Sequence, residues 1–369
     1  MLAARAKGSV ERMDRRKTRG IKVGRVAVGG GTAVSVQTMT KTDTADVAAT
    51  LAEIESVAAA GADIVRVAVP DARAAAALGK IAKASPLPVV ADIHFDAGLA
   101  IESIRNGAAC VRINPGNMAD MEGVRAVVGE AKRAHVPIRI GLNSGSVRRK
   151  GEKVESEYEL ADLMVERALE YARSFENWGF GDIKLSLKAS TAEATIYAYR
   201  KVAGLCDYPL HVGVTATGPH EYAIVKSAVG IGALLSEGIG DTIRVSLTGP
   251  PEDEVRVGRE ILASLGLATL PYEVISCPTC GRATLDVAAM AKAVEEATRR
   301  LPIHKGRTIR IAVMGCEVNG PGEAKDADVG VACGLDSGLL FVRGEKVRKV
   351  TAGKIVATLI EEAKKLIAH

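Results

Sequence analysis

Aromatic residues are scarce in this sequence, since Phe, Trp and Tyr together make up 3% of its 369 residues. The core must therefore be built from Val, Ile, Leu and Ala, a composition that suits buried parallel strands covered by Ala-rich helices. The same scarcity argues against a base-stacking surface, and there is no basic stripe interleaved with aromatics, so we expect no nucleic-acid binding. The net charge of +5 is compatible with an anionic small molecule or an acidic protein partner.

Long apolar runs are also missing, and we expect the N-terminus to be a basic tail and not a signal peptide. No stretch approaches the ~18 apolar residues that a membrane helix needs, and the longest candidate, residues 223–235, contains Lys226. The charged N-terminus has no apolar segment of the kind found in signal peptides. We therefore expect a cytoplasmic protein without membrane contact, in which clustered thiols favour metal binding over disulfides.

Short β-branched runs alternate with Ala/Leu/Glu-rich helical stretches over most of the chain. The runs span residues 34–37, 64–69, 89–94, 110–116, 138–143, 183–190, 210–218 and 242–247. Eight repeats of strand and helix predict an α/β fold, a (β/α)8 TIM-type barrel. A doubly wound sheet is the alternative, but it would need a phosphate-binding Gly-rich first turn. The glycine-rich residues 28–32 precede the first run, so we interpret them as a turn.

The chain length favours one large domain followed by a smaller one. From Pro271 the pattern changes to that of a compact α+β unit, for which we expect a β-hairpin and an amphipathic closing helix. We place a flexible basic tail at residues 1–20, the barrel at residues 21–268, and the small α+β domain at residues 269–369.

Six cations interrupt strand runs that should be buried. They are Arg66, Arg112, Arg139, Lys184, Lys188 and Arg244. Side chains alternate between the faces of a strand, so Arg112 and Asn114 share a face. A buried cation must be paired or lie at the open end of the barrel, and Asp92 is the only acid on the eight runs. We infer a cationic funnel at the C-terminal face of the barrel, where such folds carry active sites, that binds a phosphate or diphosphate.

Cysteines mark a second site. Cys277 and Cys280 form a C-x-x-C pair, and Cys316 follows a strand far downstream. Zinc usually takes four Cys or His ligands as two close pairs, and the second pair is missing. A thioredoxin-like redox pair would leave Cys316 unexplained. An iron–sulfur cluster fits better, because its ligands can come from scattered loops.

The fourth ligand of such a cluster has two candidates. Cys333 ends a strand, whereas Glu323 lies in a Gly/Pro-rich turn. A carboxylate is a weak, exchangeable ligand for a soft site, which would suit an enzyme that needs one iron open to its substrate. Cys110 and Cys206 are interpreted as buried structural thiols.

Several motifs together resemble one known family. They are ADIHFD (91–96), RINPG (112–116), KLSLKAS (184–190), LLSEGIGDTIRVSL (234–247), CPTCGR (277–282) and VNGPGEA (318–324). In this order they resemble the 4-hydroxy-3-methylbut-2-enyl diphosphate synthases, the iron–sulfur enzymes of the non-mevalonate isoprenoid pathway. The resemblance implies reductive ring opening of 2-C-methyl-D-erythritol 2,4-cyclodiphosphate to 1-hydroxy-2-methyl-2-(E)-butenyl 4-diphosphate.

The resemblance also implies cofactor, partners and site residues. The family's [4Fe–4S] cluster has three cysteine ligands and one glutamate, which match Cys277, Cys280, Cys316 and Glu323. Electrons come from flavodoxin or ferredoxin, and in a homodimer the cluster domain of one subunit lies over the barrel mouth of the other. Substrate contacts are assigned to Arg66, Arg112, Asn114, Arg139, Asn143, Lys188, Thr215, Arg244, Ser246 and Asn319.

One departure from the family concerns the proton donor. The family commonly reads T-E-A-G after the seventh strand, where this chain has Thr-Ala-Thr-Gly at residues 215–218. Glu221, His220 or water could replace the missing carboxylate, or it is dispensable, and no proton donor is assigned. Two rival functions stay open: a zinc-stabilised barrel that binds phosphorylated ligands or an acidic protein, and a pterin-dependent methyltransferase-like barrel, which offers no role for the cysteines.

Overall fold

The computed structural model describes residues 14–118, 120–144, 147–148, 154–215, 218–301 and 307–367. The chain forms two compact units, one reaching to Ala268 and one starting at Thr269. None of the helices in the described residues has the length and apolar character needed to cross a membrane.

The first unit is built around eight parallel strands. They are β3 (Ser35–Met39), β4 (Ile64–Ala68), β5 (Val89–Asp92), β6 (Cys110–Ile113), β7 (Ile138–Asn143), β8 (Ile183–Lys188), β9 (His211–Val212) and β10 (Thr242–Ile243). Their order in the sheet is β8-β7-β6-β5-β4-β3-β10-β9. A parallel bridge between Leu185 and Leu210 joins the two ends of this sheet. The predicted (β/α)8 barrel is therefore confirmed.

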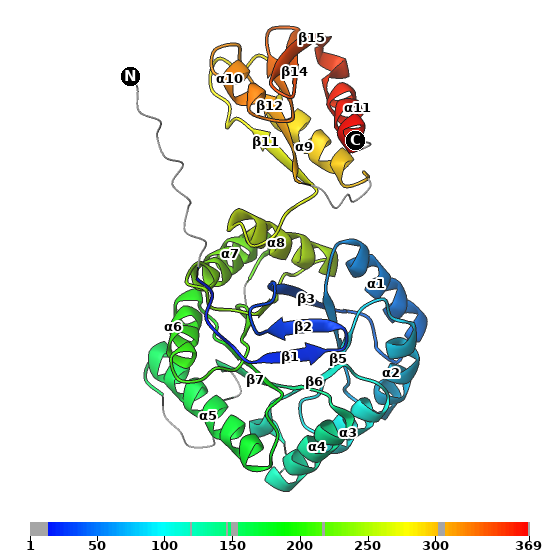
Figure 1. Ribbon diagram of the computed structural model, residues 1–369, viewed down its shortest axis with the longest axis vertical. Coiled ribbons are helices and arrows are strands. Elements are labelled where there is room, and N and C mark those ends of the chain that lie inside the picture. Colours follow the sequence, from blue (N-terminus) through cyan, green and yellow to red (C-terminus); the bar gives the residue numbers. More distant parts are fainter. Residues whose placement is uncertain are drawn as a thin grey trace, which may run out of the picture. The chain divides into compact units, whose positions relative to one another are not determined.

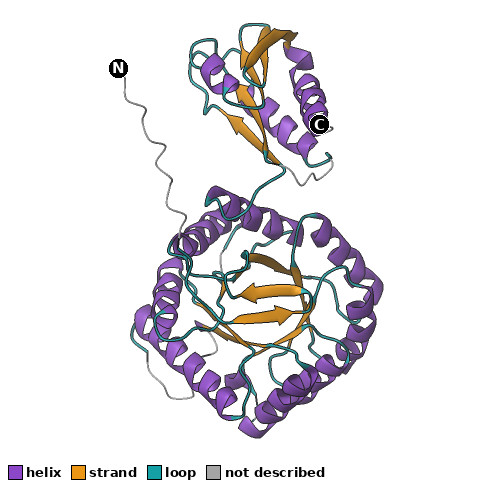
Figure 2. Ribbon diagram, viewed as in Figure 1, coloured by secondary structure: helices purple, strands orange, loops and turns teal. Residues whose placement is uncertain are grey.

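Helices follow the strands and form a ring around them (Figure 2). They are α1 (Val47–Ala59), α2 (Ala72–Ala84), α3 (Ala97–Arg105), α4 (Met121–Ala134), α5 (Glu157–Asn177), α6 (Ala192–Ala203), α7 (His220–Ser236) and α8 (Pro251–Ser264). Short polar side chains such as Asp46 and Asp71 accept a hydrogen bond from a backbone N–H in the first helical turn. Such caps begin a helix soon after its strand ends, as in the loop between β4 and α2, whereas the loop between β7 and α5 is longer.

An N-terminal hairpin lies across one end of the barrel (Figure 1). Its strands β1 (Gly20–Val23) and β2 (Val26–Gly29) pair antiparallel. Its buried side chains Ile21, Val23 and Val28 pack against Ile64, Val90 and Cys110 of the barrel. The interpretation of residues 28–32 as a turn is confirmed for Gly30 and Gly31, but it missed the strand that ends at Gly29. Gly29 has a φ of +76°, and a Cβ there would collide with the carbonyl oxygen of Arg19.

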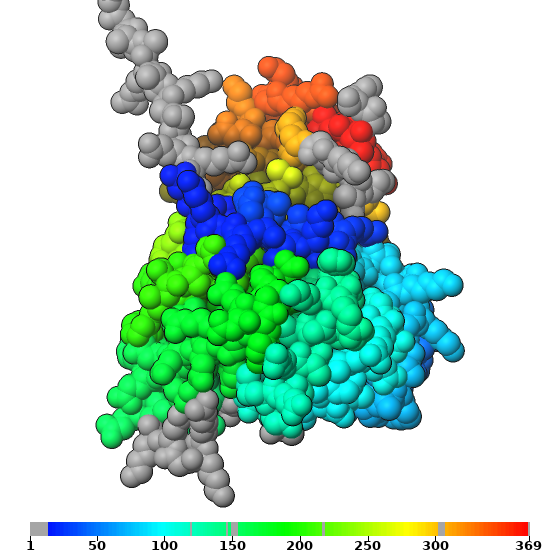
Figure 3. Space-filling model, turned by 60° about the horizontal axis from the view of Figure 1, so that its bottom comes forward, coloured from blue at the N-terminus to red at the C-terminus, as the bar shows by residue number. Residues whose placement is uncertain are grey.

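The residues before the hairpin are held against the barrel. Arg15 Nη2 donates to the Gly240 carbonyl at 2.7 Å, and Arg16 Nε donates to the Ala203 carbonyl at 3.0 Å. Arg19 Nε contacts Asp207 at 2.6 Å. Figure 3 shows this segment in dark blue, lying on the barrel surface. Part of the tail expected at residues 1–20 therefore contacts the barrel through Arg15, Arg16 and Arg19, and residues 1–13 lie outside the described part.

The second unit has a five-stranded sheet in the order β11-β12-β13-β14-β15. The strands are β11 (Tyr272–Ser276), β12 (Ile309–Met314), β13 (Val329–Cys333), β14 (Ser337–Val342) and β15 (Glu345–Thr351), and the helices are α9 (Val287–Thr298), α10 (Gly320–Lys325) and α11 (Ile355–Ile367). The first three strands are parallel and the last two pair antiparallel. Residues of α9 and α11 share one buried cluster with the sheet, and Ala324 of α10 belongs to another.

Candidate functional site

A row of charged side chains crosses the interior of the barrel from β5 to β8. In register, Asp92 pairs with Arg112, Arg112 with Arg139, and Arg139 with Lys184. All four residues are buried. The adjacent residue Leu185 belongs to the core between strands and helices. Because side chains alternate along a strand, the charged row faces the barrel interior.

Arg112 is the best connected cation of this row. Its Nη1 lies 3.1 Å from Asp92 Oδ1, and its Nη2 donates to the Gly141 carbonyl at 2.9 Å. Arg66 Nε lies 3.7 Å from the other oxygen of Asp92. Burial by itself would raise the pKa of Asp92, but Arg66, His94 and Arg112 outweigh it and hold that pKa well below its usual range. Asp92 is therefore an anion that orients two guanidinium groups.

Arg244 has a partner that the strand pattern did not indicate. Its Nη2 lies 3.1 Å from Glu254 Oε1, and Glu254 Oε2 accepts a hydrogen bond from Thr38 Oγ1 at 2.8 Å. Glu254 is only 1% exposed, although it lies in the first turn of α8. A buried carboxylate with this many partners is fixed in place, so Arg244 is held in one orientation toward the interior.

The interior nevertheless carries more positive than negative charge. The cations Arg66, Arg112, Arg139, Lys188 and Arg244 are all buried or nearly so. Within the described residues, the carboxylates that pair with them are Asp92 and Glu254. Burial lowers the pKa of Lys188 well below its ordinary value, and Arg244, Arg66 and Arg139 add to this effect. Such a surplus of buried positive charge is suited to an anionic ligand.

Two glycines leave room for these side chains. A Cβ at Gly141 would collide with Arg112 Nε, and a Cβ at Gly213 would lie 2.6 Å from Lys188 Nζ. Both glycines face the interior in the middle of the barrel, where any larger residue would displace a cation.

Gly141→Ala is expected to weaken substrate binding, because the added methyl group pushes the Arg112 guanidinium away from Asp92. Overpacking of this kind costs about 1–3 kcal/mol, so KM should rise by roughly 5- to 150-fold. Steady-state kinetics measures this rise. Gly129→Ala in α4 is the matched control, because a Cβ there meets nothing within 4 Å; an equal KM in both variants would contradict the prediction.

The other predicted substrate contacts of the first unit lie at the C-terminal ends of the strands. Asn114 follows β6 directly, and Asn143 ends β7, in register with Lys188. Asn114 Oδ1 also accepts from the Gly116 amide at 3.2 Å and begins the short helix η1 (Pro115–Asn117). Thr215 lies beyond the end of β9. These residues are at the same end of the barrel as Lys188, which ends β8, and Arg244, which follows β10.

A pocket of about 460 Å³ opens at this end. Its lining includes Lys41, His220, Arg244, Ser246 and Glu254. The structure thus brings Arg244 and Ser246, two of the predicted substrate contacts, to one pocket. Ala216 and Thr217, where the proton-donor question arose, lie outside the described residues.

The three predicted cysteine ligands and Glu323 line one pocket of about 270 Å³ in the second unit, together with Asn319. Cys277 follows β11, and Cys316 comes two residues after β12, its parallel neighbour. Parallel neighbours end at the same edge of a sheet, which explains why distant cysteines meet there. Across the described residues, no three His, Cys, Asp or Glu side chains are grouped closely enough to hold a single metal ion.

Two of these thiols receive backbone hydrogen bonds. The Gly315 amide donates to Cys277 Sγ at 3.2 Å. Backbone N–H groups of Asn319, Val318 and Gly320 lower the pKa of Cys316. The thiolate is the form that binds metal, so this loop favours the ligand state of Cys316.

The remaining cysteines have a different environment. Cys333 is fully buried, and burial raises its pKa to about 11, with a further rise from Cys277. Burial also raises the pKa values of Cys110 and Cys206. Cys333 is not among the residues that line the 270 Å³ pocket, which favours Glu323 over Cys333 as the fourth ligand.

Comparison with known proteins assigns the chain to a family. The family model described as "GcpE TIM-barrel domain" matches residues 18–259, and the model described as "GcpE protein C-terminal domain" matches residues 273–365. The chain belongs to the GcpE family. Both units of this GcpE-family protein are thereby matched, and the recognition made from the motifs is confirmed.

Curated relatives share about half of their residues with this GcpE-family protein. A protein of Ruminiclostridium cellulolyticum is 49% identical over 95% of this chain and 98% of its own length. A protein of Geobacter sulfurreducens is 49% identical over 96% of this chain and 99% of its own length. Both are named 4-hydroxy-3-methylbut-2-en-1-yl diphosphate synthase (flavodoxin). Among solved structures, a dihydropteroate synthase from Coxiella burnetii in complex with pteroic acid is similar in fold alone, with a TM-score of 0.50 and 12% identity over 67% of this chain and 97% of its own.

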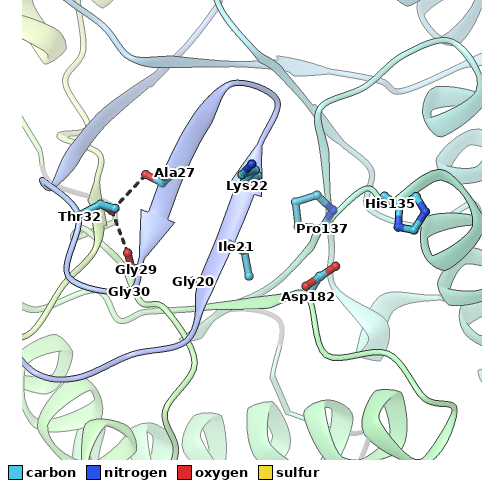
Figure 4. A pocket seen from close by; sticks show the side chains of 10 residues that line it. All are labelled: Gly20, Ile21, Lys22, Ala27, Gly29, Gly30, Thr32, His135, Pro137 and Asp182. Atoms are coloured by element: carbon cyan, nitrogen blue, oxygen red, sulfur yellow. Dashed lines mark hydrogen bonds between the residues drawn. The ribbon is translucent and has the colours of Figure 1, made fainter.

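A further pocket of about 460 Å³ lies beside the hairpin strands of this GcpE-family barrel, far along the strands from the predicted contacts. Figure 4 shows Lys22, His135 and Asp182 around it, together with the glycines of the hairpin. All three side chains are on exposed residues, and none of the predicted site residues lines this pocket. It therefore plays no part in the site described above.

Proposed function

We propose that the protein catalyses the two-electron reductive ring opening of 2-C-methyl-D-erythritol 2,4-cyclodiphosphate to 1-hydroxy-2-methyl-2-(E)-butenyl 4-diphosphate. The curated relatives carry the name of this activity at 49% identity over nearly the whole chain. The observation that supports it best is the surplus of buried cations in the barrel, which suits a diphosphate. The second support is the pocket lined by three cysteines and Glu323.

An iron–sulfur cofactor fits the donor set of the second unit. Cys277, Cys280, Cys316 and Glu323 surround a pocket instead of converging on a point, which suits a group larger than one ion. We infer a [4Fe–4S] cluster held by these four side chains. When bound, such a cluster supplies electrons one at a time. The carboxylate is the weakest ligand for a soft site and can exchange.

The barrel residues bind and orient the substrate in this proposal. Arg66, Arg112 and Arg244 are fixed by Asp92 and Glu254 and present N–H groups to the diphosphate. A ring carbon–oxygen bond breaks and leaves its electron pair on the diphosphate, and the C3 hydroxyl takes up a proton and leaves as water with its bonding pair. The two electrons that enter form the new C2–C3 double bond of the product. Preorganised cations stabilise the charge that the diphosphate gains as the ring opens.

Partners follow from the relatives' name and from the family resemblance. We propose flavodoxin as the electron donor, with ferredoxin as the alternative that the same assay tests. The homodimer expected from the resemblance stays a prediction, which light scattering of the purified protein would measure. A dimeric mass is expected, and a monomeric mass at assay concentrations would contradict it.

Anaerobic purification followed by a visible spectrum and metal analysis tests the cofactor. We expect a broad absorption near ~400 nm with about four irons per chain, and turnover of the cyclic diphosphate with reduced flavodoxin. A colourless protein with one zinc per chain would contradict the redox function, although the phosphate-binding barrel would remain.

Glu323→Gln is expected to lower turnover more than cluster content, because the three thiolates remain while the exchangeable ligand is lost. Iron and sulfide analysis together with the ring-opening assay separates the two effects. Glu345→Gln on exposed β15 is the matched control. Loss of iron equal to that of a cysteine variant would show that Glu323 is not an exchangeable ligand.

A further inference from the structure

One titratable side chain at the mouth of the barrel has no role in the site described above. His220 is the first residue of α7 and is half-buried. It lines the same pocket as Arg244 and Ser246, two of the predicted substrate contacts. Its neighbour Glu221 is exposed and is not among the residues that line this pocket. The structure therefore separates two side chains that the sequence leaves open as proton donors.

The ring of His220 lies beside the loop between β10 and α8. A Cβ at Gly249 in this loop would be 3.7 Å from its Nδ1. Lys41 Nζ donates hydrogen bonds to the carbonyls of Gly249 and Leu247 and so holds the loop in place. Among the described residues, none forms a hydrogen bond or ion pair with the His220 ring. The imidazole is therefore available to a molecule bound in the pocket.

The other titratable side chains of the pocket are already engaged. Glu254 Oε1 accepts from Arg244 Nη2 at 3.1 Å, and its Oε2 accepts from Thr38 Oγ1 at 2.8 Å. Arg244 is an arginine and keeps its proton at any working pH. Lys41 donates to two carbonyls, and an ammonium group is a much weaker acid than an imidazolium. Of the described side chains that line this pocket, His220 is the one suited to release a proton near neutral pH.

The proposed reaction consumes a proton when the C3 hydroxyl leaves as water. Water leaves far more readily than hydroxide, so a general acid that donates this proton accelerates the step. The donor must lie next to the substrate, which Arg244 and Ser246 are expected to contact in the same pocket. An imidazolium suits this role because its acidity is matched to neutral pH.

We propose that His220 is a catalytic residue that donates this proton, an inference that rests on the proposed function. The N–H bond of its imidazolium breaks as the proton passes to the hydroxyl oxygen. The C3–O bond breaks with its electron pair on that oxygen, and water leaves. The neutral ring then regains a proton from solvent, which reaches this half-buried residue.

The charges around His220 couple its protonation to substrate binding. Lys41 and Arg244 line the pocket just after β3 and β10, Glu254 lines it from α8, and Glu221 is exposed next to His220 on α7. Before the substrate binds, the two cations disfavour a further positive charge in the pocket. The diphosphate adds negative charge beside Arg244 and favours the imidazolium. His220 therefore takes up its proton when the substrate binds.

Kinetics of His220→Gln tests the proposal in the ring-opening assay with reduced flavodoxin in excess. We expect kcat to fall by at least about 100-fold, the lower end of what a general acid contributes, while KM and iron content stay near those of the wild type. Glu221→Gln tests the rival donor and should keep the wild-type kcat, since its side chain lies outside the pocket. An unchanged kcat in His220→Gln would overturn the proposal, and so would a loss of kcat confined to Glu221→Gln.

The pH profile separates proton donation from a structural role. Only the protonated ring donates, so the wild-type kcat should fall as the pH rises, and this fall should be missing from His220→Gln. Imidazole added to His220→Ala should restore part of the lost kcat and leave the wild type unchanged. Profiles of the same shape in wild type and His220→Gln would overturn the proposal. If the variants do not fold, a wild-type kcat that does not fall with rising pH overturns it.

Calorimetry tests the same residue without turnover. Binding of the cyclic diphosphate to the full chain is measured in buffers of different ionisation enthalpy, which gives the protons taken up on binding. The uptake should be smaller in His220→Gln than in the wild type, and equal uptake would overturn the proposal. A wild-type chain that does not open the ring would contradict the proposed function. A wild type that opens it no faster than His220→Gln would contradict this inference alone.

Discussion

Cys316→Ser is expected to remove the iron–sulfur absorption and the ring-opening activity together. Cys316 lies in a loop whose backbone N–H groups favour its thiolate, and a serine hydroxyl is a poor ligand for iron in a soft site. Loss of a side chain that only supports a metal ligand already costs about 10- to 100-fold in affinity or activity. The loss of a ligand itself should therefore reduce turnover by at least about 100-fold. Iron and sulfide counts, the visible spectrum and the ring-opening assay measure these effects.

Two other cysteine variants make this experiment decisive. Cys206→Ser is the matched control, because Cys206 belongs to the barrel and its thiol donates to the Val202 carbonyl at 3.4 Å. It should keep its iron and its activity. Cys333→Ala tests the rival fourth ligand and should also keep its iron, with some loss of stability from the buried site. If Cys316→Ser kept the cluster while Cys333→Ala lost it, the ligand assignment would be wrong.

The barrel could be predicted from the sequence because its strands have a simple pattern. Apolar residues such as Val65 and Val67 face the helices, whereas Arg66 between them faces the interior. Alternation of this kind reports the face of a side chain directly. It does not report depth along the strand. The sequence therefore could not separate Lys188 and Arg244, at the C-terminal ends of their strands, from Lys184 near the start of β8.

The partners of the cations were harder to foresee. Asp92 ends β5, and its place in a predicted strand identifies it as an acid among the buried cations. Glu254 was missed, because an acidic residue in the first turn of a helix usually lies in solvent, where its charge interacts favourably with the helix dipole. The available signal was its position before Val255, Val257 and Gly258, which places it near the buried face of α8.

The hairpin was missed for a related reason. Its strands are four residues long and contain Gly20 and Gly29, and glycine weakens a strand pattern. The hairpin is stabilised by its tertiary contacts with Ile64 and Val90, which a local sequence pattern does not show. The cysteine site needed tertiary information too, because the meeting of Cys277 and Cys316 depends on β11 and β12 being neighbours in the sheet.

Arg112→Gln is expected to weaken substrate binding, so KM should rise by a much larger factor than kcat falls. Arg112 is held by Asp92 and the Gly141 carbonyl, so its guanidinium is oriented before the diphosphate arrives. A hydrogen bond to a charged group contributes about 1.5–3 kcal/mol, which corresponds to a rise in KM of roughly 10- to 150-fold. Steady-state kinetics and binding of the cyclic diphosphate to the full chain measure this rise.

The controls for Arg112 separate charge from geometry. Arg105→Gln removes a surface guanidinium that pairs with Glu130 and should leave KM unchanged. Arg112→Lys keeps the charge beside Asp92 but loses the planar fork, so it should bind the substrate with intermediate affinity and unfold near the wild-type temperature. In Arg112→Gln, Asp92 loses one charged partner and keeps Arg66 and His94. This variant should therefore unfold at a lower temperature than Arg112→Lys. An unchanged KM in Arg112→Gln, with the chain still folded, would show that Arg112 does not bind the diphosphate. The surplus of buried cations would then have to bind a different anion.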